Sequence, residues 1–333
     1  MKEITIQKEN EYLSPYAKKS SETLGRQRKE AECPMRTAFQ KDRDRIIYSK
    51  AFMRLKNKTQ VFFSPEGDHY RTRLTHTLDV SQVARSIARM LCLNEDLAEA
   101  IALGHDLGHT PFGHAGERCL DKLSSHGFKH NQQSLRVVDV LEKDGKGLNL
   151  TYEVRDGIVN HKMSGNPQTL VGQVVSFADR IAYISHDIDD AIRAGVIEFS
   201  DLPAKAIKKL GKSTSARINI AIGSIARASY GKDKVTMEDD IFAALNEVRS
   251  FMFERVYQTP SAIKEEETAF NMLSAMYNYF STHIDRLPER YIKLLKKYDI
   301  DTVLCDYLSS MTDRYAVYTF ENIFVPKNFF VRG

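Results

Sequence analysis

The chain has 333 residues, 42% hydrophobic and 28% charged, so it is long enough for one large core or two smaller domains and too apolar for disorder. Its net charge of +4 is mildly basic, far from that of a dedicated nucleic-acid arm, and favours anionic ligands. Apolar runs are too short for a membrane span or a signal peptide and the four cysteines lie far apart, so we expect a cytoplasmic protein without disulfides, thiolate zinc or membrane contact.

The first part of the chain, residues 1–70, is predicted to be a helical, basic segment that contributes to the active site and to interfaces. The basic side chains in it and just after it are Arg36, Lys41, Arg43, Arg45, Lys50, Arg54, Lys56, Lys58, Arg71 and Arg73. Such a run is either a set of solvated helix faces or a surface that meets phosphate groups, and the sequence leaves both interpretations open.

The central part, residues 71–200, begins with two strong helix patterns. Thr75 is expected to cap the first helix, which His76 then opens and whose apolar positions form one stripe. Asn94, followed by two acidic residues, is expected to cap the second helix. This helix should stop just past His105 and Asp106, which places that pair at a helix end.

A third helix is predicted to start at Asn166 and to stop by Gly195, with Asp179 in its middle. Residues 201–333 continue the helical spacing, and Thr236 is expected to begin a capping box there. Strand-like alternation is short and rare throughout. We therefore predict an all-α protein whose C-terminal helices pack on the central part.

Histidines are concentrated in one region of the sequence. Six of the ten fall between positions 76 and 130, and five of these are candidate site residues together with Asp106 and Glu117: His76, His105, His109, His114 and His130. Imidazole and carboxylate ligands favour Mn, Fe, Co, Ni or Zn, with Mg as a further candidate, over the all-oxygen cage of calcium. Adjacent helical residues point about 100° apart, so His105 and Asp106 need partners from other helices, which His76 and Asp179 can supply.

Each of these side chains also has a purely structural interpretation. A lone buried histidine or aspartate usually bonds a backbone group or caps a helix. Asp179, however, stands among apolar residues of its predicted helix, where a carboxylate is costly unless it is paired or bound to metal. The combined pattern favours a metal site.

The order His76, His105-Asp106, Asp179 is an H…HD…D pattern, and with it the sequence resembles the HD-domain metal-dependent phosphohydrolases. Three stretches are similar to deoxyguanosine triphosphate triphosphohydrolases and related dNTP triphosphohydrolases: KTQVFFSPEGDHYRTRLTHTLDVSQVAR, ALGHDLGHTPFGHAGE and FADRIAYISHDIDDA. The resemblance spans almost the whole chain. It implies an HD-domain helical core with additional C-terminal helices and a divalent metal on these four residues. It also implies a homo-oligomer, tetramer or hexamer, and an allosteric nucleotide or single-stranded DNA as a further partner.

The resemblance also places roles on matching positions. His114 is expected to donate a proton to the departing sugar oxygen, Glu117 to orient it, and His109 and His130 to line the same pocket. The expected substrate contacts are Gln60 and Asp187 at the 3′-hydroxyl, Arg73, Arg180 and Arg249 at phosphates, Tyr183 beneath the sugar, Tyr257 against C2′ and Gln258 at the base. A tyrosine against C2′ leaves no room for a 2′-hydroxyl, which favours deoxyribose.

The implied reaction converts a dNTP, with dGTP as the default and other dNTPs as further substrates, into deoxynucleoside and tripolyphosphate. An HD-type phosphodiesterase or alarmone hydrolase is one alternative, although LGHTPFGH replaces the acidic pair expected in alarmone hydrolases and no second set of metal ligands is evident. A nucleotide- or single-strand-binding regulator would use the basic run. Such a regulator has little reason to place His114 and Glu117 beside a metal.

Overall fold

The computed structural model describes residues 1–60 and 71–326, and within them the prediction of an all-α protein is confirmed. No strand forms in these residues, apart from two isolated bridges between short backbone segments. The α-helices of the described residues are α1 (Lys2–Tyr12), α2 (Ala38–Ile47), α3 (Lys50–Arg54), α4 (Arg73–Met90), α5 (Glu95–Gly104), α6 (Gly113–Leu123), α7 (His130–Arg136), α8 (Glu142–Gly145), α9 (Tyr152–Val159), α10 (Leu170–Arg193), α11 (Ala204–Leu210), α12 (Thr214–Ser229), α13 (Asp239–Met252), α14 (Pro260–Thr282), α15 (Glu289–Ile292), α16 (Ile300–Ser309) and α17 (Asp313–Phe324). Residues 61–70, which belong to the first family-like stretch, lie outside the described residues.

Helix α4 begins three residues earlier than the sequence predicts, which corrects the expectation that Thr75 is its cap. The hydroxyl of Thr72 accepts the backbone N–H of Thr75 at 3.4 Å, and the Thr75 hydroxyl accepts the N–H of Thr72 at 3.1 Å. This reciprocal pair satisfies two amide groups at the helix start. His76 therefore lies one turn inside α4 rather than at its first position.

The other two helices of the central part agree more closely with expectation. Asn94 caps α5 by accepting the backbone N–H of Leu97 at 3.1 Å, and α5 ends at Gly104, so His105 and Asp106 follow directly after it. Helix α10 is capped by Thr169, whose hydroxyl accepts the N–H of Gly172 at 3.1 Å, and not by Asn166. The helix ends at Arg193, before Gly195, as predicted.

Helix α13 starts at Asp239, later than expected, and Glu238 is the residue before its first position. Thr236 therefore does not cap this helix. The Thr236 backbone instead forms a turn with Ser229, whose hydroxyl accepts the Thr236 N–H at 2.8 Å and donates to its carbonyl at 2.9 Å. Several hydroxyl and carboxylate residues lie near each of these helix starts. The contacts that each one makes elsewhere in the fold decide which of them caps the helix.

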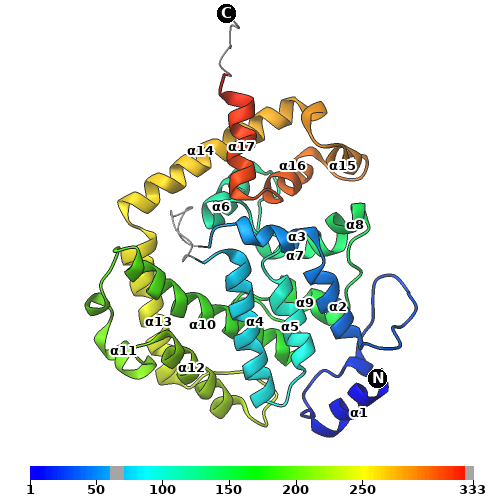
Figure 1. Cartoon of the computed structure of the whole chain (residues 1–333), viewed down its shortest axis with the longest axis vertical. Helices are drawn as coiled ribbons and strands as arrows, with labels where there is room; N and C mark the ends of the chain where they lie inside the picture. Colours follow the sequence, from blue (N-terminus) through cyan, green and yellow to red (C-terminus); the bar gives the residue numbers. More distant parts are fainter. Residues whose placement is uncertain (61–70, 327–333) are drawn as a thin grey trace, which may run out of the picture.

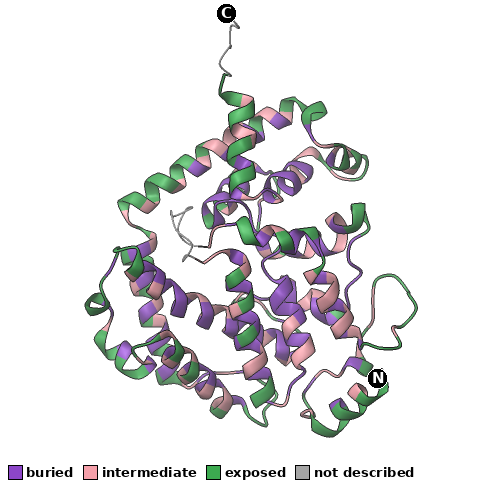
Figure 2. Ribbon diagram, viewed as in Figure 1, coloured by how far each residue is buried: buried purple, intermediate pink, exposed green. Residues whose placement is uncertain are grey.

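Helices α4, α5 and α10 lie at the centre of the molecule, and their facing surfaces are buried (Figures 1 and 2). One apolar cluster joins them to α2, α9 and α11 to α13. A second cluster joins α6 to α14, α16 and α17. The loop between α5 and α6 and the start of α6 therefore lie where the two clusters meet, and this region holds several of the candidate site residues.

No helix in the described part of the chain is long and apolar enough to cross a membrane.

Candidate metal centre

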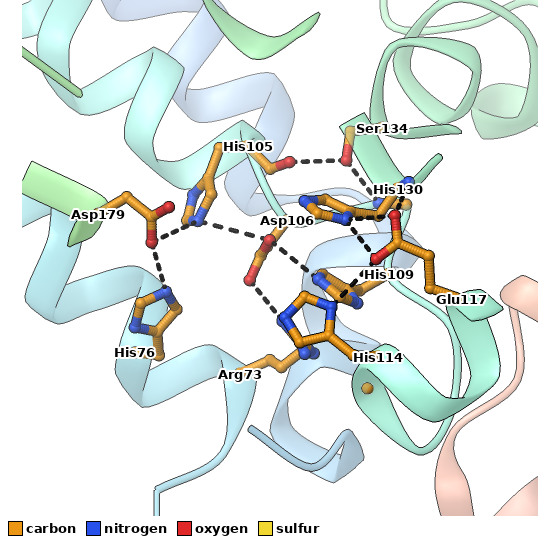
Figure 3. Close-up of polar contacts among 12 residues, drawn as sticks. Arg73, His76, His105, Asp106, His109, His114, Glu117, His130, Ser134 and Asp179 are labelled. Atoms are coloured by element: carbon orange, nitrogen blue, oxygen red, sulfur yellow. Dashed lines mark hydrogen bonds and ion pairs between the residues drawn. The ribbon is translucent and has the colours of Figure 1, made fainter. Parts of the chain in front are cut away.

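The four predicted metal ligands, named here the metal quartet, come together from three separate elements (Figure 3). His76 projects from α4, His105 and Asp106 follow α5, and Asp179 lies on α10. Asp179 Oδ1 is 3.1 Å from His76 Nε2 and 3.9 Å from His105 Nε2, and Asp106 Oδ1 is 3.5 Å from His105 Nε2. The ligand atoms of His76, His105 and Asp106 all lie within 4.8 Å of one another.

Hydrogen bonds orient the quartet so that its lone pairs face one another. The His105 Nδ1 lies 2.6 Å from the Ala102 carbonyl oxygen, which only accepts, so Nδ1 carries the proton and Nε2 keeps its lone pair. Arg73 donates to Asp106 Oδ2 at 2.8 Å and leaves Oδ1 on the imidazole side. Two imidazoles and two carboxylates in this arrangement fit a divalent transition metal.

The electrostatics of the quartet keep its carboxylates ionised. Burial opposes ionisation of Asp179, but the hydrogen bond from His76 and the nearby imidazoles outweigh it and lower the pKa of Asp179 to about 2. Burial likewise opposes the charge of Asp106, yet His105, His109 and the Arg73 guanidinium hold its pKa well below the ordinary value. Charged carboxylates are the form that binds a cation.

A second group of titratable side chains, named here the histidine–glutamate group, lies beside the quartet. Its members are His109, His114, Glu117 and His130. Glu117 Oε2 is 3.1 Å from Nδ1 of His114 and 2.8 Å from Nδ1 of His130, and Glu117 Oε1 accepts the backbone N–H of His130 at 3.0 Å. The rings of His109 and His130 stack with their centroids 4.1 Å apart. The predicted pairing of His114 with Glu117 on one helix is therefore present in α6.

Glu117 is the anionic centre of this group. Burial raises its pKa, but hydrogen bonds from His114 and His130 lower it far more, so the carboxylate is ionised. An ionised carboxylate only accepts, and therefore both histidines present Nδ1–H to it. His114 is 65% exposed at its side chain, whereas His130 is buried, so His114 is the member that solvent or a ligand can reach.

The structure adds one histidine to the site that the sequence interpretation missed. His161 follows α9, is buried, and its ring centroid lies 5.0 Å from that of His105. Its Nδ1 is 2.7 Å from the Ile158 carbonyl oxygen, three residues earlier, the same relation that His105 has to Ala102. Burial and the neighbouring imidazoles lower the pKa of His161 to about 3. A histidine two residues past the end of a predicted helix was the available signal, but it lies outside the sequence cluster.

The ligand atoms of Asp106, His130 and His161 also lie within 4.8 Å of one another. These three side chains form a second group that could hold a metal ion, which the sequence did not make evident. The sequence could not show this set, because His161 reaches the other two residues only through the packing of α9 against α7 and α5.

Four of the residues expected to bind substrate form a second contact region between α10 and the end of α13. Arg249 Nε donates to the Tyr183 hydroxyl at 3.1 Å, and the Tyr257 hydroxyl donates to Asp187 Oδ2 at 2.5 Å. Burial raises the pKa of Asp187 to about 7, against the opposing hydrogen bond from Tyr257. Tyr183 lies one turn from Asp179 of the quartet on the same helix, which connects this region to the metal centre.

Of the remaining four expected substrate residues, Arg73 bonds Asp106, and the other three have the following surroundings. Arg180 hydrogen-bonds Asn246 and lies over the Phe242 ring at 5.3 Å. Gln60 has a buried side-chain oxygen for which the described residues supply no hydrogen-bond partner. Gln258 is exposed just after a π-helical turn. No hydrogen bond within the described residues joins these three to the quartet.

Many side chains of the basic run are paired with other groups of the same chain. Arg43 pairs with Asp96 at 3.3 Å, and Arg45 pairs with Glu30 at 2.7 Å. Lys58 is buried and donates to the Ser309 carbonyl at 2.7 Å. These contacts favour a structural role for the run over a free nucleic-acid surface.

Comparisons with known proteins show what this chain is similar to. Residues 73–184 match the HD domain and residues 235–322 match the phosphohydrolase-associated domain. The chain is 54% identical to the deoxyguanosinetriphosphate triphosphohydrolase-like protein of Caldanaerobacter subterraneus, over 99% of this chain and 97% of that protein. It is 46% identical to the protein of the same description from Clostridium tetani, over 95% and 93%. The fold is similar to that of a Bacteroides thetaiotaomicron phosphohydrolase, with a TM-score of 0.55, 17% identity, and coverage of 85% of this chain and 69% of that one.

Proposed function

This chain belongs to the HD-domain phosphohydrolases described as deoxyguanosinetriphosphate triphosphohydrolase-like, and from that premise we propose that it hydrolyses dNTPs, dGTP by default, to deoxynucleoside and tripolyphosphate. The observation that carries the proposal is the position of the His114–Glu117 pair beside the metal quartet. A metal-binding set and an oriented proton donor in one site are what hydrolysis of a phosphate ester requires.

Each group of residues in the site would have a separate role in the reaction. The quartet would hold a divalent ion, which when bound polarises a phosphate oxygen and makes water more acidic. Arg73 lies in the same buried region, and its Nε has no partner within the described residues, so it can neutralise phosphate charge. His114, held through Nδ1 by Glu117, turns Nε2 away from the carboxylate and donates the proton to the departing 5′-oxygen. His109 and His130 line the pocket and exclude water.

The region between α10 and α13 would hold the deoxynucleoside. Tyr183 lies beneath the sugar, and Asp187 bonds the 3′-hydroxyl together with Gln60. The hydrogen bond to Asp187 fixes the Tyr257 ring, which packs on C2′ and excludes a 2′-hydroxyl. Steric exclusion by an aromatic ring held in place is a physical basis for preferring deoxyribose.

The remaining assignments complete the proposal. Arg180 and Arg249 bind phosphates, and Gln258 contacts the base. The active form is a homo-oligomer, a tetramer or hexamer, regulated by a nucleotide or single-stranded DNA.

The test is a product assay on pure protein supplied with each divalent metal in turn. All four dNTPs, the matching ribonucleotides, a cyclic dinucleotide and an alarmone are incubated separately, and the products are resolved by anion-exchange chromatography. We expect tripolyphosphate and deoxynucleoside from dGTP, and little product from GTP. His114→Ala should lower turnover by roughly 10²- to 10⁴-fold, whereas His126→Ala, which removes an exposed histidine elsewhere on the surface, should not.

Other results would redirect the assignment. Cleavage of the alarmone or the cyclic dinucleotide in place of dNTPs would favour the phosphodiesterase or alarmone hydrolase alternative. Nucleotide or single-strand binding without turnover, unchanged by His114→Ala, would favour a regulator.

A further inference from the structure

We propose that Asp313, the first residue of α17, is a positioning residue that places both His114 and Gln60 for the reaction. Its side chain is buried and contacts two segments that are distant in sequence. Oδ1 accepts the backbone N–H of Phe112 at 3.0 Å, and Oδ2 accepts the backbone N–H of Thr59 at 2.9 Å together with the Thr59 hydroxyl. Phe112 lies two residues before His114, and Thr59 directly precedes Gln60. One carboxylate from the C-terminal helices therefore holds both segments.

The backbone of Phe112 adopts a conformation that needs such a partner. Its φ of 60° and ψ of 29° lie in the left-handed region, which residues with a Cβ rarely adopt, and Gly113 follows with a φ of 54°. A strained conformation of this kind persists only where the surrounding contacts determine it. The hydrogen bond to Asp313 is one such contact. It sets the start of α6, the helix that carries His114 and Glu117.

The segments that Asp313 holds meet at close range beside the metal quartet. A Cβ atom added to Gly113 would lie 3.2 Å from a guanidinium nitrogen of Arg73 and 3.5 Å from the carbonyl oxygen of Gln60. The Arg73 guanidinium in turn donates to Asp106 Oδ2 at 2.8 Å. A shift of either segment would therefore disturb the arginine that orients a member of the quartet.

A second buried charge holds the other end of the same turn. The Lys58 ammonium, directly before Thr59, donates to the carbonyl oxygen of His109 and, at 2.7 Å, to that of Ser309. Burial lowers the pKa of Lys58 well below its ordinary value, and Asp313 is a nearby anion that favours the charged form. Residues 109 and 112 are thus both fastened to the C-terminal helices, which makes these helices part of the support of the site.

Asp313 acts on the reaction through the residues that it holds, and not by contact with the reacting atoms. For the roles of His114 and Gln60 this inference rests on the proposed function, whereas its two backbone contacts can be measured without any nucleotide. A misplacement of about 1 Å can lower a rate by about 10²-fold, so we expect Asp313→Ala to lower kcat for dGTP by about 10- to 100-fold. The preference for dGTP over 2′,3′-dideoxy-GTP should also fall, because Gln60 is proposed to bond the 3′-hydroxyl.

Hydrogen exchange on the full-length protein tests the contacts directly. Mass spectrometry with fragmentation that resolves single amides follows the backbone N–H groups of Thr59 and Phe112 without nucleotide. In the wild-type protein we expect both to exchange at least about 100-fold more slowly than amides of an unfolded peptide. Asp313→Asn keeps only one acceptor oxygen, so at least one of the two amides should lose this protection. Unprotected amides in the wild-type protein would overturn the proposal even when no variant folds.

Kinetics then separate positioning from a general loss of folding. The matched control is Asp301→Ala, because Asp301 Oδ2 accepts the N–H of Ser125 at 3.1 Å and its hydroxyl at 2.5 Å beyond the other end of α6. We expect this control to keep kcat and the preference for dGTP within about twofold. Asp313→Ala should lower both, and should lower kcat by a smaller factor when His114→Ala is already present.

Two kinetic results would overturn the proposal. One is an equal decrease of kcat/KM for dGTP and the dideoxy nucleotide in Asp313→Ala, and the other is an equal loss of kcat with and without His114→Ala. A wild-type protein that protects both amides but hydrolyses no nucleotide would instead refute the proposed function and leave the two contacts of Asp313 supported.

Discussion

Replacing Glu117 with glutamine removes one charge from the centre of the histidine–glutamate group and keeps its shape. Glu117 Oε2 lies near Nδ1 of both His114 and His130, at 3.1 and 2.8 Å, and Oε1 accepts the backbone N–H of His130 at 3.0 Å. A glutamine offers one acceptor oxygen in place of two. If the glutamine oxygen keeps its hydrogen bond with His130, the amide NH₂ group faces Nδ1 of His114. His114 then loses the acceptor that orients its ring.

The expected loss follows from this one hydrogen bond. A hydrogen bond to a charged group contributes about 1.5–3 kcal/mol. At about 1.4 kcal/mol per tenfold change, this corresponds to a decrease of about 10- to 150-fold in kcat. His114 is 65% exposed at its side chain, so water competes for the bond and we expect the lower end, about 10- to 30-fold. KM should change little, because Glu117 is not placed at the substrate.

The assay compares steady-state kcat and KM for dGTP in the wild-type protein, Glu117→Gln, His114→Ala and the double variant, with thermal melts to verify folding. When Glu117 acts through His114, adding Glu117→Gln to His114→Ala should change kcat less than about twofold. Equal losses in both backgrounds would refute this reasoning and assign the contribution to His130.

The remaining predictions concern stability and specificity. Burial raises the pKa of Asp187 from 3.8 to about 7, so the folded protein holds this proton more tightly than the unfolded chain. Protonated Asp187 contributes its full stabilisation below about pH 4, and this contribution is lost as the pH rises towards 7. Asp187→Asn should therefore flatten the pH dependence of the free energy of unfolding over this range, measured by urea unfolding at a series of pH values. Asp306→Ala leaves Arg136 without its buried partner at 2.7 Å and should lower the free energy of unfolding by about 3–5 kcal/mol, whereas Glu289→Ala, in an exposed pair, should lower it much less; equal losses would contradict this. Divalent metal at about 100 times its Kd should stabilise the wild-type protein by about 2.7 kcal/mol in the same assay, and a similar gain in His105→Ala would count against the quartet. Tyr257→Phe removes the hydrogen bond that fixes its ring, and should increase the ratio of GTP to dGTP turnover; an unchanged ratio would exclude Tyr257 as the 2′ filter.

Local sequence rules predicted the helices of the centre well and their first residues less well. The cap at Asn94 and the stop before Gly195 were predicted correctly, because a single capping or breaking residue stands at each position. At the start of α4, α10 and α13 several hydroxyl or carboxylate residues compete, and contacts made elsewhere in the fold select among them. Thr236 is an example, since its backbone is already paired with Ser229.

The sequence by itself determined the all-α class and the pairing of His114 with Glu117, and it predicted the four residues of the metal quartet, because these depend on residue type, on helical spacing or on a family-like motif. Only the tertiary structure decided which distant side chains share one site. His76 and Asp179 meet because α4 packs on α10, and His161 reaches His105 and His130 because α9 packs beside α5 and α7. Spacing along a chain encodes neighbours on one helix, whereas contacts between helices arise from the packing of their apolar faces.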